Sequence, residues 1–244
     1  MTVLPVLDLL KGVVVRGVAG RRTEYRPLLS KLLETSTPLD VAFALRTEFG
    51  FQRLYVADLD GILHRRPNWI AYQQLIDGGF KLLIDAGITS VEGARRLNGL
   101  GCDVVIGLES SPSPEQVSRM VAASEAVTFS LDLKNGQPML AEGASGWSHN
   151  PLEIVRQAID GGISRLIVLD LADVGVGSGT RTGSLCQSLL AEFPGLHLTC
   201  GGGVRGVEDL RAWQALGAKQ ILVASALHDG KLSTGDLAEF AAVG

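Results

Sequence analysis

Two aspartates stand in matching sequence contexts in the two halves of this chain. Asp8 lies in a Leu-Asp-Leu triplet followed by Gly12, and Asp132 lies in the same triplet followed by Gly136. Two carboxyl groups on opposite sides of one substrate can act as general acid and general base when their surroundings separate their pKa values. The pattern predicts proton-transfer catalysis by Asp8 and Asp132. The alternative is that such aspartates cap helices or pair with basic side chains.

Glycines and other small residues end two apolar runs near the C-terminus. Three glycines, 201–203, follow the run that begins at Leu198, and Ala-Ser-Ala ends the run over residues 220–226. Glycine lets a backbone approach a ligand closely, and a helix N-terminus beside such a turn offers N–H groups to an anion. The predicted phosphate-binding residues are Gly202, Gly203, Ala224 and Ser225.

Polar residues also follow the other apolar runs, at the positions where strands would end. Asp85, Gly87, Gly107 and Glu109 are candidates for contact with a substrate. Asp170 is a further candidate, although structural pairing suits it at least as well. Trp147, in a long polar stretch over residues 134–148, either stacks on a planar substrate or anchors that loop. The histidines show no metal-ligand spacing, so neither a metal nor a cofactor is expected.

The elements that would position these residues alternate between strands and helices. The predicted strands cover residues 3–9, 53–58, 81–85, 103–107, 126–133, 165–171, a short run from 198, and 220–226. The predicted helices cover residues 40–49, 69–77, 91–99, 114–122, 150–160, 184–192, 207–216 and 235–243. Residues 59–67 are a predicted loop, and the glycine-rich residues 173–183 are a predicted mobile lid. Such alternation indicates a parallel sheet.

Segments of the first half of the chain recur in the second half. Residues 82–110 match residues 198–226 at an offset of 116, and residues 53–59 match residues 165–171 at an offset of 112. Nearly equal offsets close to half the chain length indicate an internal duplication. The duplication favours a closed (β/α)8 TIM barrel of the α/β class over an open sheet, and it places Asp8 opposite Asp132 at the barrel mouth. We expect one domain over residues 1–244, with half-barrels at about 1–123 and 124–244.

The composition narrows the class of protein further. The net charge is −4 without any basic block, which argues against nucleic-acid and anionic-membrane partners. No apolar run approaches the roughly 20 residues that cross a bilayer, and the apolar N-terminus lacks a basic leader, so we interpret it as the first strand. The three cysteines are scattered, which indicates neither a disulfide framework nor a zinc site. We expect a cytoplasmic enzyme.

Residues 4–25, LPVLDLLKGVVVRGVAGRRTEY, resemble the first strand and loop of a known family. The family comprises the histidine-biosynthesis isomerase, which converts a phosphoribosyl aminoaldose to an aminoketose, and a sister cyclase. The resemblance covers residues 3–232 and implies a half-duplicated (β/α)8 barrel. It places the two catalytic aspartates of the family on Asp8 and Asp132. It also implies a phosphate site at residues 202, 203, 224 and 225, and roles for Arg16 and Gly20 in the first loop.

The first half of the chain departs from the family pattern. The family ends its third strand with a glycine pair and an arginine, where this chain has Asp85 before Gly87. After the fourth strand the family has a glycine and a small hydroxyl residue, whereas here Gly107 is followed by Leu108 and Glu109. Carboxylates in these places would repel a phosphate. One phosphate site is therefore retained, and the other has become acidic.

Three hypotheses follow for the function. The first is an isomerase that uses the two aspartates on a substrate with a single phosphate, outside histidine synthesis. The second is the histidine-biosynthesis isomerase itself, whose substrate has two phosphates. The third is a non-catalytic barrel subunit that binds a phosphate ligand. Each hypothesis implies a small phosphorylated molecule as the partner, and none predicts an oligomeric state.

Overall fold

Strand β1 (Thr2–Leu10) pairs in parallel with β4 (Arg53–Asp58) on one side and with β11 (Gln220–Val223) on the other, so the sheet closes on itself. The computed structural model describes residues 1–124, 126–175 and 181–240. Between β4 and β11 the barrel contains β5 (Lys81–Asp85), β6 (Asp103–Gly107), β7 (Val127–Lys134), β9 (Arg165–Asp170) and β10 (His197–Gly201). The predicted (β/α)8 barrel is confirmed.

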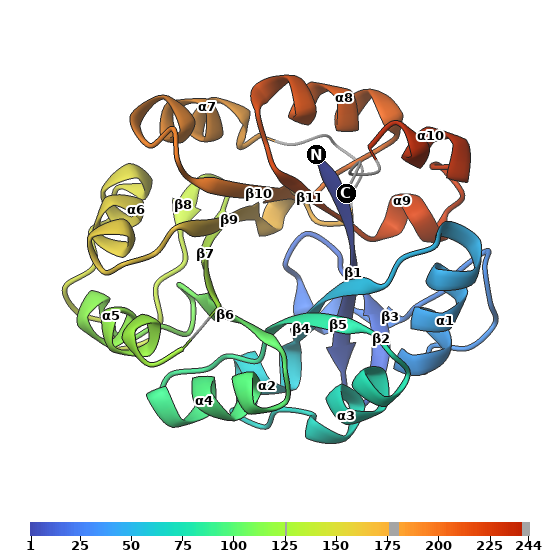
Figure 1. The fold of residues 1–244 in the computed structure, drawn as a ribbon, viewed down its shortest axis with the longest axis horizontal. Coiled ribbons are helices and arrows are strands. Elements are labelled where there is room, and N and C mark those ends of the chain that lie inside the picture. Colours follow the sequence, from blue (N-terminus) through green and yellow to red (C-terminus); the bar gives the residue numbers. More distant parts are fainter. Residues whose placement is uncertain (125, 176–180, 241–244) are drawn as a thin grey trace.

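Helices surround this barrel and cover the outer face of the sheet (Figure 1). They are α1 (Pro38–Phe49), α3 (Trp69–Asp77), α4 (Val91–Gly99), α5 (Pro114–Ala122), α6 (Pro151–Asp160), α7 (Gly183–Glu192), α8 (Val207–Leu216) and α10 (Thr234–Ala238). Polar side chains cap several of them: Asn68, Ser90 and Ser113 each accept a hydrogen bond from a first-turn N–H. These caps satisfy donors that a helix leaves without internal partners.

Short elements extend the carboxyl ends of the strands over the barrel mouth. An antiparallel hairpin of β2 (Val13–Arg16) and β3 (Arg26–Pro27), with the 3-10 helix η1 (Arg22–Glu24) between them, continues the sheet from β1. β8 (Gln137–Pro138) pairs with the end of β7. Three short helices follow strands directly: α2 (Leu59–His64), η2 (Leu171–Asp173) and α9 (Ser225–His228).

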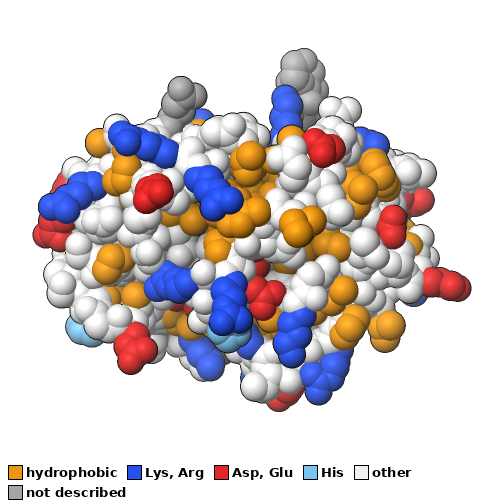
Figure 2. Space-filling view, turned by 90° about the horizontal axis from the view of Figure 1, so that it is seen from below, with side chains coloured by type: hydrophobic (Ala, Val, Ile, Leu, Met, Phe, Trp, Pro, Cys, Tyr) orange, Lys and Arg blue, Asp and Glu red, His pale blue; other side chains and the backbone are white. Residues whose placement is uncertain are grey.

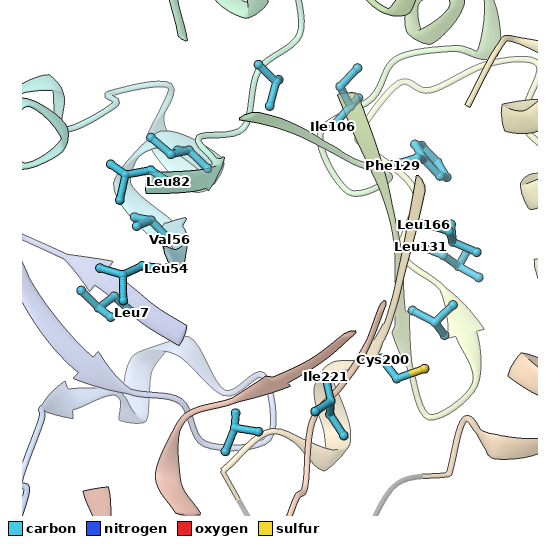
Figure 3. Close-up of a cluster of buried hydrophobic side chains, with 14 of the residues drawn as sticks. Leu7, Leu54, Val56, Leu82, Ile106, Phe129, Leu131, Leu166, Cys200 and Ile221 are labelled. Atoms are coloured by element: carbon cyan, nitrogen blue, oxygen red, sulfur yellow. The ribbon is translucent and has the colours of Figure 1, made fainter. Parts of the chain in front are cut away.

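Apolar side chains pack on both faces of the barrel wall. The larger cluster lies between strands and helices, and Figure 3 shows Val56, Phe129 and Leu166 pointing outward from the barrel. A smaller cluster, which includes Tyr55 and Leu83, packs inside the barrel. Because successive side chains of a strand point to opposite faces, each strand contributes to both clusters.

Several predicted boundaries need correction. Residues 59–67 are not a loop throughout, because Asp58 accepts a hydrogen bond from the Gly61 N–H and caps α2. The last barrel strand ends at Val223, and Ser225 already begins α9. The final helix ends at Ala238. Part of the predicted lid, residues 176–180, lies outside the described residues.

The surface carries both signs of charge. On the face drawn in Figure 2, basic and acidic side chains are interspersed. Within the described ranges, the structure contains no helix with the length and apolar character needed to cross a membrane.

Asp58 and Asp170 have similar local roles at the ends of β4 and β9. Asp58 caps α2, and Asp170 caps η2 by accepting a hydrogen bond of 2.9 Å from the Ala172 N–H. Asp58 also accepts a hydrogen bond of 2.6 Å from the Asn68 N–H and one from the Tyr72 hydroxyl. These contacts hold the strand ends to the segments that follow. The internal duplication itself stays a prediction.

Tyr72→Phe is expected to destabilise the protein by about 1–3 kcal/mol, because the buried Asp58 carboxylate loses a donor that water cannot replace. Urea unfolding measures this change. Gln73→Ala, at an exposed position of the same helix, is the control and should change stability by less than about 0.5 kcal/mol. Equal stability of wild type and Tyr72→Phe would contradict the role assigned to this hydrogen bond.

Candidate active site

A cavity of about 330 Å³ lies at the carboxyl ends of the barrel strands. Besides Asp229, which pairs with Arg16, four carboxyl groups line it: Asp8 from β1, Asp85 from β5, Asp132 from β7 and Glu109 from the loop after β6. The strand register explains why three of them meet. Asp8 and Asp85 both pair with Ala57 of β4, from opposite sides, and Asp132 projects inward from its own strand.

Gly107, a predicted substrate-binding residue, separates two of these carboxyl groups. A Cβ atom at this position would lie 3.1 Å from Asp85 Oδ2 and 3.1 Å from Asp132 Oδ2. Both distances are shorter than ordinary van der Waals contact. The missing side chain of Gly107 therefore gives the two carboxyl groups the room they occupy.

Asp132 is held by its own strand and by the next loop. Its Oδ1 accepts a 2.7 Å hydrogen bond from the Ser130 hydroxyl, and its Oδ2 accepts a 3.4 Å bond from the Glu109 N–H. Burial raises the pKa of Asp132 well above its usual value, and the negative charges of Glu109 and Asp85 add to this effect. This carboxyl group therefore retains a proton more readily than a solvated aspartate.

Asp8 and Asp85 also hold their protons more strongly than usual. Burial raises the pKa of Asp8 to about 7, against the opposing effect of the Arg22 charge. Burial likewise raises the pKa of Asp85 to about 7, although the Gly87 N–H favours its charged form. A carboxyl group with a pKa near 7 can give or take a proton at neutral pH.

Arg22 faces this cluster from η1. Its guanidinium Nη2 donates to both carboxylate oxygens of Glu109, at 2.6 and 2.7 Å. Its positive charge also lowers the pKa of Asp8 and of Asp85. The sequence analysis missed this residue. Its only signal was the pair of arginines in a polar loop, and such a loop does not indicate which arginine turns inward.

The four predicted phosphate-binding residues line the same cavity at the ends of β10 and β11. Gly202 and Gly203 have φ angles of 91° and 72°, which favour glycine. Among the described residues, none accepts a hydrogen bond from the backbone N–H of Ser225 or Ala226. These N–H groups at the cavity wall are suited to an anion.

Basic side chains lie near this second side. Lys231 lines the cavity, and so does Arg16, which sequence analysis assigned to substrate binding. The Arg16 guanidinium donates two hydrogen bonds to the Asp229 carboxylate, at 2.7 and 2.6 Å. This ion pair neutralises much of the Arg16 charge and joins β2 to the segment after α9.

The corresponding backbone groups of the first half already have partners within the protein. The Gly87 N–H donates to Asp85 Oδ1 at 3.0 Å, and the Gly87 carbonyl accepts a 2.7 Å bond from Arg65. After β6, the Leu108 N–H donates to the Ser130 carbonyl at 2.9 Å. Gly87 also packs against the backbone of α2, and it does not line the cavity.

Four other predicted substrate-binding residues do not line the cavity: Gly20, Gly107, Trp147 and Asp170. Trp147 stacks on Phe129, with ring centroids 5.4 Å apart, and its indole N–H donates to the Ser111 carbonyl. Of the two alternatives for Trp147, this position favours loop anchoring. Asp170 accepts bonds from the N–H groups of Asn135 and Gly136, and Gly20 packs on Leu171.

No group of three or more His, Cys, Asp or Glu side chains in the described part of the chain has an arrangement that could hold a metal ion.

A closed (β/α)8 barrel with ionisable groups and backbone donors at the carboxyl ends of its strands belongs to the class of TIM-barrel enzymes. Within that class, the chain belongs to the family described as "Histidine biosynthesis protein", whose model matches residues 2–233. The family resemblance seen in the sequence is therefore confirmed.

One similar protein is the 1-(5-phosphoribosyl)-5-((5-phosphoribosylamino)methylideneamino)imidazole-4-carboxamide isomerase from Halobacterium salinarum. It is 30% identical to this chain over 242 residues, and the match covers 96% of this chain and 95% of that protein. An isomerase of the same name from Carboxydothermus hydrogenoformans is 27% identical and covers 95% of each chain. An uncharacterized protein from Methanocaldococcus jannaschii is 28% identical and also covers 95% of each chain. The prediction of an enzyme of the isomerase class agrees with the named relatives.

Asp85→Asn is expected to stabilise the protein more at pH 8 than at pH 4. The pKa of Asp85 is about 7 in the folded chain and 3.8 without the fold, so wild-type folding becomes less favourable as pH rises between these values. The gain at pH 8 should be on the order of 1–4 kcal/mol. Urea unfolding at both pH values measures it, with the exposed Asp160→Asn as control. A gain that is equal at both pH values would contradict the raised pKa.

Proposed function

We propose that this protein is an isomerase that transfers protons with Asp8 and Asp132 on a phosphorylated sugar derivative. Gly202, Gly203, Ala224 and Ser225 hold its phosphate. One observation carries the proposal: a cavity of about 330 Å³ joins carboxyl groups of raised pKa to backbone N–H groups suited to an anion. Membership of a family with named isomerases supports it.

The chemistry needs two groups of opposite protonation state. Isomerisation of an aldose first removes a proton from the carbon beside the C=O or C=N group and protonates the oxygen or nitrogen of that group, which gives an enediol or enaminol. The hydroxyl group on the second carbon then loses its proton and the first carbon gains one, which gives the ketose, and the two catalytic groups exchange roles for this second step. The proton count balances when a carboxylate takes the first proton and a carboxylic acid gives the second. Asp8 and Asp132 reach the cavity from two strands, β1 and β7. The pKa of Asp8, about 7, lets that group supply either form at neutral pH, and the raised pKa of Asp132 favours its protonated form.

The substrate carries one phosphate in this proposal. In the first half, Asp85 accepts the Gly87 N–H and Glu109 adds a second carboxylate. An internal carboxylate thus takes the place that a second phosphate would need, and like charges disfavour that phosphate. Hydroxyl or amino groups are the substrate groups that Asp85 and Glu109 can bind.

The alternative is the activity named for the Halobacterium salinarum relative, whose substrate has two phosphoribosyl groups. Identity of 30% over 96% of the chain favours it. Arg22 provides a physical route, because its guanidinium could exchange the Glu109 carboxylate for a phosphate. Binding of the bis-phosphorylated substrate would then require the 2.6 Å Arg22–Glu109 ion pair to open.

Asp8→Asn and Asp132→Asn are each expected to lower kcat by about 100-fold or more, because each removes one of the proton-transferring groups. Binding of inorganic phosphate, measured by isothermal titration, should stay within about twofold. Asp160→Asn is the exposed control. Unchanged turnover in the Asp8→Asn, Asp132→Asn double variant would disprove the catalytic roles, and normal ligand binding without wild-type turnover would favour a non-catalytic subunit.

Ribose 5-phosphate is expected to bind more tightly than the bis-phosphorylated aminoaldose, because the acidic half of the cavity repels a second phosphate. Titration of the wild type with both compounds measures the difference. Glu109→Gln should narrow the gap by removing one negative charge. Tight binding and turnover of the aminoaldose by the wild type would instead establish the alternative function.

A further inference from the structure

Tyr55 lies beneath the carboxyl groups and has no part in the proton transfer described above. Its side chain is 4% exposed and lines the cavity. No described residue forms a hydrogen bond with its hydroxyl, and the oxygen is open to the cavity and not sealed within the core. The Tyr72 hydroxyl, by contrast, donates to Asp58. A buried donor left open to a cavity is suited to a group on a bound molecule.

The strand register places Tyr55 below the carboxyl groups, on the inner wall of the barrel. Tyr55 pairs with Leu83, one inward-facing layer below Asp85, and Ala57 occupies the layer above Tyr55 on the same strand. Two residues of a strand span about 6.6 Å, close to the reach of a tyrosine side chain. The small Ala57 leaves that space open. Leu83 borders a separate cavity at the opposite end of the barrel, whereas Tyr55 borders the cavity that Asp8 lines.

The charges around Tyr55 keep its hydroxyl protonated. Burial raises the pKa of Tyr55 well above its usual value, and the charges of Asp85, Asp132, Asp8 and Glu109 act in the same direction. The phenol therefore serves as a neutral hydrogen-bond donor and not as a base. A fixed donor has its largest effect where negative charge develops during a reaction.

We propose that Tyr55 is a further catalytic residue, whose hydroxyl donates a hydrogen bond to the substrate oxygen that gains negative charge in the enediol step. The inference rests on the proposed isomerase function. Tyr55 transfers no proton in this step. Asp8 and Asp132 move the protons, and Tyr55 stabilises the charge that appears between the two transfers.

Tyr55→Phe is expected to lower kcat by about 100-fold with little change in KM, because the hydrogen bond strengthens in the transition state. The variant keeps the ring, so its melting temperature and pH profile should stay close to those of the wild type. Tyr72→Phe is the matched control: it loses the same hydroxyl group outside the cavity and should melt earlier with unchanged kcat. Unchanged kcat in Tyr55→Phe would overturn the inference and leave the proposed function intact.

A binding measurement decides the case if the wild type turns over no sugar phosphate, which would overturn the proposed function. The probe is phosphoerythronohydroxamate, a planar mimic of a sugar-phosphate enediolate. At least tenfold weaker binding of the hydroxamate to Tyr55→Phe, with equal affinity for inorganic phosphate, supports the inference, and equal binding of the hydroxamate overturns it.

If the Tyr55→Phe variant does not fold, carbon-13 NMR of labelled tyrosine in the wild type replaces the binding measurement. A Tyr55 signal that shifts with the hydroxamate but not with phosphate supports the role, and an unmoved signal overturns it.

Discussion

The pairing of β1 with β11 closes the sheet, and the candidate site depends on that closure. In a closed parallel barrel the carboxyl ends of all strands meet at one rim. Asp8 and Asp132 are 124 positions apart in the chain, yet both line one cavity. An open sheet with the same strands would leave its first and last strands at opposite edges. The phosphate side, next to β11, would then lie far from Asp8 on β1.

The closed rim also concentrates negative charge. Asp8, Asp85, Glu109 and Asp132 surround one cavity, and Arg22 is the basic side chain that pairs directly with the group. Separating four charges from water is costly, and one guanidinium offsets only part of the repulsion. Burial is the main cause that raises the pKa values of Asp8 and Asp85 to about 7, and a retained proton removes the cost of burying each charge. The geometry that destabilises the charged cluster thus makes its members suitable for proton transfer.

Sequence periodicity predicted the elements well where local pattern and packing agree. Residues 69–77, 91–99 and 207–216 have the predicted helix bounds, because apolar spacing agrees with a capping residue at one end of each: Asn68, Ser90 and Gly217. The helix at 59–64 was not predicted, because its N-cap, Asp58, is also the last residue of the preceding strand and the residues after it suit a loop equally well. Arg22 and Tyr55 were missed for a different reason. Their importance comes from the side chains that surround them in the barrel, and no local motif records those neighbours.

The two halves of the barrel offer backbone groups at similar places but satisfy them differently. In the first half, the Asp85 carboxyl group accepts the Gly87 N–H, so that donor already has a partner within the protein. In the second half, the N–H groups of Ser225 and Ala226 have no acceptor among the described residues. A phosphate bound there would place the rest of the substrate toward Asp8, Asp132 and the Arg22–Glu109 pair. The unequal use of these backbone groups, open after β11 and occupied by Asp85 after β5, therefore orients the substrate in the proposed function.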